Sequence, residues 1–157
     1  MLRLFSAAVV AALVLAGGAG SAAAASLNRV LEAVAPIKVI TPDMMQAGTL
    51  GNGREGFLYK SVEDGLILSV AGPAADVDEV NALVSLGGAG QEAVSKAIGI
   101  SVLVAAVTKD KASLAWAGEA LKNLGNGWKA TFSGWAVDLS PVADTSVIHV
   151  LITKTVR

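Results

Sequence analysis

The chain has 157 residues, of which 54% are hydrophobic and 16% are charged, and its formal net charge at pH 7 is −1. No run of like charges is long enough for a nucleic-acid patch, which argues against a nucleic-acid partner. The chain has no cysteine, which excludes thiol nucleophiles, thiolate zinc sites and disulfides, so core packing alone must hold the fold.

Residues 1–25 have the three parts of a secretory signal peptide. Arg3 precedes an apolar run from Leu4 to Leu15, and a small-residue tract ends at Ala25. The apolar run is shorter than the ~20 residues that span a bilayer, which disfavours an uncleaved membrane anchor. We expect cleavage after Ala25, a single mature domain over residues 26–157, a periplasmic or secreted location in a bacterium, and no stable transmembrane span after cleavage.

The first part of the mature chain predicts two short helices. Ser26 is a suitable N-cap for a helix whose apolar residues fall on one side up to Val34. Thr41-Pro42-Asp43 has the composition of a second helix start, which the glycines from Gly48 onward limit to two turns.

A hairpin is predicted next. Residues 57–62 and 66–71 alternate as strands do, with a turn at Glu63-Asp64-Gly65. After it, the acidic residues Asp76, Asp78 and Glu79 predict the start of a helix, with Val80 and Leu83 on its apolar side.

Residues 90–108 predict a buried helix, because the segment from Ala97 to Val107 is apolar except at Gly99 and Ser101. Asp110 is expected to cap a further helix that ends at Gly125. Strands are predicted over residues 128–132 and 135–139, with a bulge or sharp bend at Ser133-Gly134 where the apolar phase changes, and over 147–155.

This order predicts an α+β fold. We expect an antiparallel sheet of about four strands, formed by two hairpins, with helices packed on one face and the buried apolar helix among them.

Few residues suggest chemistry. The segment Gly51–Gly56 matches G-x-G-x-x-G by letter, but a strand follows it where a dinucleotide site needs a helix, so we interpret it as a loop. The cluster Gly87–Gly90 precedes the buried helix and has the backbone to hold a small anion, but we favour the simpler interpretation that it lets two helices turn sharply.

His149 is the only histidine. A catalytic arrangement would need Ser146, Asp138 or Asp144 beside it, and a single histidine does not make the usual multi-histidine metal centre. Its position in a strand among Val and Leu favours a structural role. We therefore predict no catalytic residues, no metal site and no cofactor.

Trp128 and Trp135 are the candidate ligand-binding residues. They lie on either side of the change of phase, and an exposed tryptophan is a typical binding anchor. The alternative is that both pack in the core, as most tryptophans do.

Three functions remain open from the sequence. The first is an exported, non-enzymatic binding or protein-interaction domain of unknown ligand, whose partner is an unknown envelope protein or a small apolar ligand. The second is a carrier of a small apolar or lipid-like ligand, held between helix and sheet beside small residues such as Gly99. The third is a membrane-active or assembling envelope protein in which Ala97–Val107 inserts or pairs.

Overall fold

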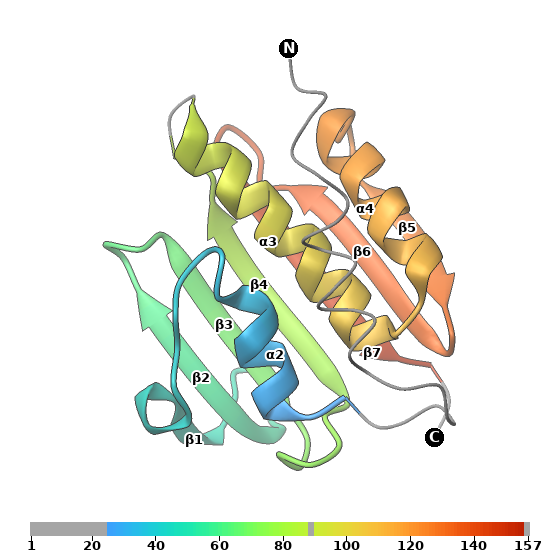
Figure 1. The fold of residues 1–157 in the computed structure, drawn as a ribbon. Coiled ribbons are helices and arrows are strands. Elements are labelled where there is room, and N and C mark those ends of the chain that lie inside the picture. Colours follow the sequence, from blue (N-terminus) through green and yellow to red (C-terminus); the bar gives the residue numbers. More distant parts are fainter. Residues whose placement is uncertain (1–24, 88–89, 156–157) are drawn as a thin grey trace.

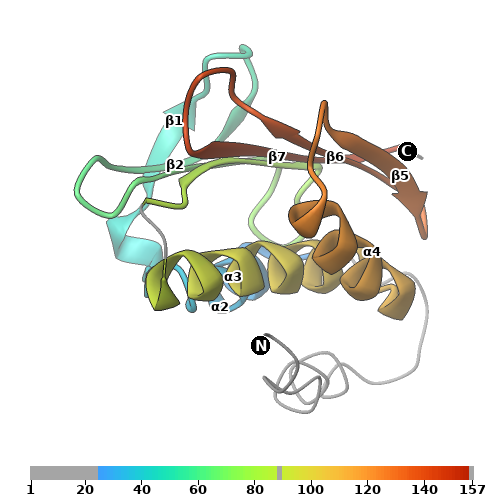
Figure 2. The ribbon, with the colours of Figure 1, turned by 90° about the horizontal axis from the view of Figure 1, so that it is seen from above.

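A computed structural model describes residues 25–87 and 90–155. They form one antiparallel sheet of seven strands in the order β1-β2-β3-β4-β7-β6-β5, with the helices on one face (Figures 1 and 2). The predicted α+β class is confirmed, but the expected sheet of about four strands was too small. The predicted signal peptide lies outside the described residues except for Ala25.

The described elements, in chain order, are α2 (Leu27–Val34), the 3-10 turn η1 (Pro42–Met44), β1 (Gln46–Thr49), β2 (Glu55–Ser61), β3 (Leu66–Ala71), β4 (Glu79–Ser85), α3 (Gln91–Thr108), α4 (Lys111–Lys122), β5 (Trp128–Phe132), β6 (Trp135–Pro141) and β7 (Val147–Lys154).

Two predicted helix caps are confirmed. Ser26 Oγ accepts a hydrogen bond from the backbone N–H of Arg29 at 3.3 Å, which starts α2. Asp110 Oδ1 accepts one from the N–H of Ala112 at 2.9 Å, which starts α4. In each case a side-chain oxygen satisfies a helix N–H that has no partner within the helix.

The buried helix is confirmed as α3. It lies between α2 and α4 (Figure 1), and every residue from Gly99 to Thr108 is buried. Among the described residues, α3 alone has the length and apolar composition to cross a membrane, and 61% of it is buried inside the protein. A core helix of a soluble protein passes the same test.

The predicted helix at residues 76–84 is wrong, because this segment forms β4. Val80, Ala82 and Val84 are buried, whereas the residues between them are only partly buried. The apolar residues therefore repeat every second position, as in a strand with one covered face. β4 pairs with β3 on one side and β7 on the other, so its backbone hydrogen bonds are satisfied along both edges.

The second predicted helix is also wrong over most of its length. Thr41-Pro42-Asp43 starts only the 3-10 turn η1, and the chain then becomes the edge strand β1. The segment Ala47-Gly48-Thr49 has poor helix formers at two of its three positions, and β2 offers it a ladder of backbone hydrogen bonds.

A bulge or a sharp bend was predicted at Ser133-Gly134, and the structure has a sharp bend there, a two-residue hairpin turn. Both residues have positive φ, 47° and 83°, as the two-residue type I′ turn requires. Phe132 and Trp135 are the closing pair. Because the chain reverses here, Phe132 and Trp135 face the same side of the sheet. The large apolar residues are therefore at even positions before the turn and at odd positions after it.

Candidate functional site

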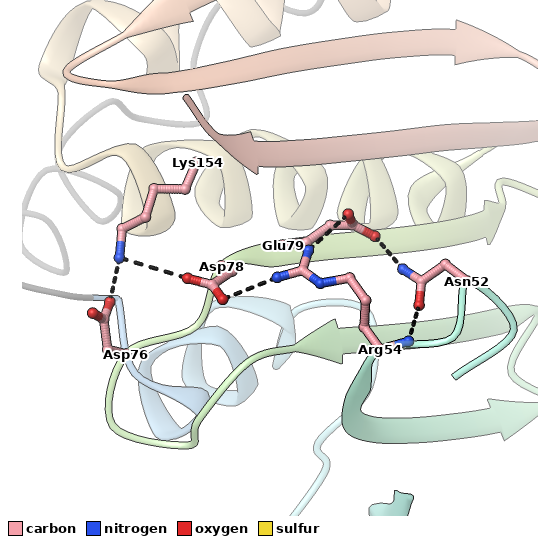
Figure 3. Close-up of polar contacts among 6 residues, drawn as sticks. All are labelled: Asn52, Arg54, Asp76, Asp78, Glu79 and Lys154. Carbon is pink, nitrogen blue, oxygen red and sulfur yellow. Dashed lines mark hydrogen bonds and ion pairs between the residues drawn. The ribbon is translucent and has the colours of Figure 1, made fainter. Parts of the chain in front are cut away.

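A charged cluster joins the start of β4 to the end of β7 and to the loop between β1 and β2. Figure 3 shows its six members, Asn52, Arg54, Asp76, Asp78, Glu79 and Lys154.

Arg54 lies at the centre of this charged cluster. Its Nη2 is 2.9 Å from Asp78 Oδ2 and its Nη1 is 3.3 Å from Glu79 Oε2. Asn52 accepts a hydrogen bond from the Arg54 backbone N–H at 3.0 Å and donates one to Glu79 Oε1 at 3.1 Å. The first four residues of the G-x-G-x-x-G segment thus form a hairpin loop held by ion pairs and hydrogen bonds, and the last two already belong to β2.

Lys154 extends the charged cluster to the end of the described chain. Its Nζ is 2.5 Å from Asp76 Oδ1 and 3.9 Å from Asp78 Oδ1. The same ammonium lies 5.6 Å from the centre of the Trp135 ring, within cation–π distance. The acidic residues that were predicted to start a helix therefore bind cations from two other elements.

The charged cluster is structural in character. Each carboxylate in it faces a cation, and none is set apart in the apolar environment that a general acid requires. Within residues 25–87 and 90–155, no group of three His, Asp or Glu side chains is placed to hold a metal ion.

The two candidate tryptophans lie on the face of the sheet that the helices cover. Trp128 is partly buried, and its indole N–H donates to the carbonyl of Asn123 at 2.9 Å. Its ring meets Trp116 of α4 edge-on, with centroids 6.2 Å apart. Trp135 is 7% exposed. Both rings are thus packed, with α4 or under Lys154, and neither stands out as a free anchor.

His149 lies on the other face of the sheet. Its Nε2 is 3.1 Å from Oδ1 of Asn81 on the neighbouring strand, so the hydrogen-bond partner is Asn81, not Ser146, Asp138 or Asp144. The side chain is partly buried. One satisfied ring nitrogen in the middle of a sheet fits the structural role predicted for it.

None of the described helices lies on this second face, which we call the open face (Figure 2). Residues facing it alternate with the buried ones along each strand. Four large aliphatic residues on it lie on neighbouring strands and form what we call the apolar strip, made up of Leu58, Ile67, Leu83 and Leu151.

The strand register places the members of the apolar strip next to one another. Ile67 and Leu83 are directly opposite across β3 and β4. Leu58 is opposite Ser69, which puts it diagonal to Ile67, and Leu151 is likewise diagonal to Leu83 across β4 and β7. Diagonal neighbours lie within reach of long side chains. The apolar strip is therefore continuous over four strands, and all its members are partly buried.

A shallow pocket continues the apolar strip toward the edge of the sheet. It has a volume of about 430 Å³ and is lined by Lys129, Ala130, Thr131, Ala136, Val137, Asp138, Leu151 and Thr153. We call it the open-face pocket. Leu151 belongs both to the pocket and to the apolar strip. Lys129 and Asp138 face each other across it, with Nζ and Oδ2 3.1 Å apart.

The open face was not predicted from the sequence. Leu83 was assigned to the apolar side of a helix, and without β4 there is no surface on which Ile67 and Leu151 approach each other. The alternation from Glu79 to Ala82, in which Val80 and Ala82 alternate with the polar Glu79 and Asn81, was the signal that could have shown β4.

Comparison with known proteins gives no match: no protein-family model, no curated protein and no solved structure is similar to the chain. A function for the chain must therefore be argued from the arrangement of its described residues.

Proposed function

We propose that the chain is an exported, non-enzymatic interaction domain that binds a partner protein on the open face of its sheet. The apolar strip is the observation that carries this proposal. An antiparallel sheet with one face in water is expected to present polar residues there. Here four large aliphatic side chains are aligned on that face instead, with polar residues such as Ser69 and Asn81 beside them.

The composition of the open face resembles that of a protein interface. Interfaces combine an apolar centre with a polar rim. Around the apolar strip stand Lys60, Ser69, Asn81, His149 and Ser140, which by register are opposite or next to its members. Another exposed aliphatic residue is Val39, which lies in the loop between α2 and η1, outside the sheet, and single exposed residues of this kind are common on protein surfaces.

The export part of the proposal is supported by the sequence of residues 1–25 and favours a periplasmic location. A partner in the same compartment would then be another envelope protein.

No specific observation on the described residues supports the carrier or the membrane-active hypothesis. The carrier hypothesis rested on small residues in α3, and at one of them, Gly99, the neighbouring space is filled by Ile37. The open-face pocket lies on the side of the sheet away from α3. The membrane-active hypothesis needs the apolar part of α3 to be free, whereas most of that helix is buried inside the fold.

The test is site-specific photo-cross-linking in cells of the source organism. A benzoylphenylalanine at Leu83 reports on the open face, and one at Val39, which is 67% exposed and lies outside the sheet, is the control. We expect a discrete adduct with another protein from position 83 only. Equal yields from both positions, or no adduct from position 83, would refute the proposal. Native mass spectrometry that found an apolar passenger would favour the carrier function.

A further inference from the structure

The carboxylate of Asp138 in the open-face pocket uses only part of its hydrogen-bonding capacity. Oδ2 pairs with Lys129, whereas Oδ1 is buried and has no hydrogen-bond partner among the described residues. It is the only buried side-chain polar atom of which this is true within residues 25–87 and 90–155. Buried polar atoms nearly always have a partner, so an exception at a pocket points to a missing donor.

The existing partner of Asp138 is easily displaced. The side chain of Lys129 is 81% exposed, and that of Asp138 is 27% exposed. An ion pair with one end in water contributes little, because solvent screens it and the long lysine side chain loses rotamer freedom in forming it. A donor group that is better matched to a carboxylate can therefore replace the ammonium.

We propose that the open-face pocket binds the guanidinium of an arginine side chain supplied by the partner protein. This inference rests on the proposed function, because it identifies one residue of the segment that covers the apolar strip. Leu151 joins the apolar strip to the pocket, so a segment lying on the strip brings its next side chain to Asp138.

Guanidinium matches this carboxylate better than ammonium does. Its planar fork donates two parallel N–H bonds to the two oxygens of one carboxylate. Rotation about the terminal torsion of Asp138, which has a broad energy profile, turns Oδ1 toward the pocket once Lys129 has moved away. The hydroxyl groups of Thr131 and Thr153 also line the pocket and can accept the remaining N–H donors.

The test uses two blocked pentapeptides as probes, leucine-valine-arginine-valine-leucine and the same peptide with citrulline in place of arginine. Citrulline keeps the shape of the side chain and removes its charge. Both are titrated into the isotope-labelled full chain and followed by NMR. We expect the arginine peptide to shift the amide signals of Thr131, Asp138 and Thr153, and the citrulline peptide to bind about tenfold more weakly.

Two variants of the same ion pair separate recognition from structure. Asp138→Asn should reduce binding of the arginine peptide to the level of the citrulline peptide. Lys129→Met should leave that binding unchanged or strengthen it, because it removes the competing cation. If the ion pair had only a structural role, the two variants would behave alike.

The outcomes also separate this inference from the proposed function. Equal binding of both peptides with shifts along the apolar strip overturns the arginine pocket and leaves the interaction domain in place. Binding of the arginine peptide that survives Asp138→Asn overturns the pocket as well, and so does the failure of both peptides to bind at millimolar concentration. The proposed function itself is decided by the cross-linking at Leu83.

Discussion

Gly99 of α3 and Ile37, which follows α2, are in such close contact that a Cβ on Gly99 would lie 2.4 Å from Cγ1 of Ile37. Real Cβ atoms do not approach another atom this closely, so Gly99→Ala must push α3 and the segment after α2 apart. Overpacking of this kind costs about 1–3 kcal/mol. We expect the urea midpoint to fall accordingly.

Gly118 provides the matched control for this prediction. It lies inside α4, and a Cβ there would have no neighbour within 4 Å. Gly118→Ala should therefore stabilise the protein by about 0.5–1 kcal/mol, the ordinary gain of alanine over glycine in a helix. If both variants moved the midpoint in the same direction, the close contact at Gly99 would not be the cause.

The stability of the protein should fall at acid pH, in part because Asp64 becomes protonated. Hydrogen bonds from Ser61, Lys38 and Tyr59, in that order of effect, lower the pKa of this carboxyl below its usual value of 3.8. A carboxyl whose folded pKa is depressed stabilises the fold above its unfolded pKa, and this contribution is lost as the pH falls through the folded pKa. Asp64→Asn should flatten the decline in urea midpoint below pH 4, and an unchanged decline would contradict this account.

The stability of the protein should also fall at alkaline pH, because Tyr59 belongs to the same group of hydrogen-bonded residues. Burial, and then the hydrogen bond to Asp64, raises the pKa of Tyr59 above 10.0. Its contribution is present below the unfolded pKa and is lost as the pH rises through the folded one. Tyr59→Phe should lose the 2.9 Å hydrogen bond to Asp64 at neutral pH. The urea midpoint of this variant should also fall less steeply above pH 10 than that of the wild type, as followed by tryptophan fluorescence.

The turn between β5 and β6 should tolerate only residues that accept positive φ. Gly134 has φ 83°, so Gly134→Ala should cost about 1–2 kcal/mol. Gly134→Asn should cost less, because asparagine visits this region more readily. The melting temperatures of the two variants check this order of stability. Equal losses of stability would show that the added side-chain volume, not the backbone conformation, is responsible.

The cleavage predicted after Ala25 should lower the stability of the fold. The backbone N–H of Val77, a fully buried residue, donates to the carbonyl of Ala25 at 2.8 Å. Cleavage after Ala25 removes this acceptor, and a buried N–H without a partner costs about 1–3 kcal/mol. A chain that begins at Ser26 should therefore unfold at lower urea concentration than one that begins at Ala25. Equal midpoints would mean that water replaces the lost carbonyl.

Local signals in the sequence were sufficient for much of the fold. Ser26 and Asp110 identified two helices through their caps, and the apolar run after Ala97 identified the third. The hairpin of β2 and β3 followed from alternation around Gly65. In each case the decisive interaction lies within a few residues along the chain.

The elements that could not be predicted depend on distant partners. In β4 the spacing of Val80, Leu83 and Val84 also fits a helix, and only pairing with β3 and β7 decides for a strand. The residues of the open-face pocket could not be predicted for the same reason, since they come from different strands. Asp138 was considered only as a partner for His149, because its neighbours Lys129 and Leu151 come from the two flanking strands.

The junction between β4 and β7 has a consequence for how the protein is made. Asn81 and His149, which hydrogen-bond across it, are 68 residues apart in the chain. Contacts so distant in sequence are slow to form, because a long loop must close before any of them is gained. In the chain α3, α4, β5 and β6 lie between β4 and β7, so all of them must be synthesised before the two halves of the sheet can join. Until then the sheet lacks its pairing between β4 and β7, and one edge of β4 has no partner strand.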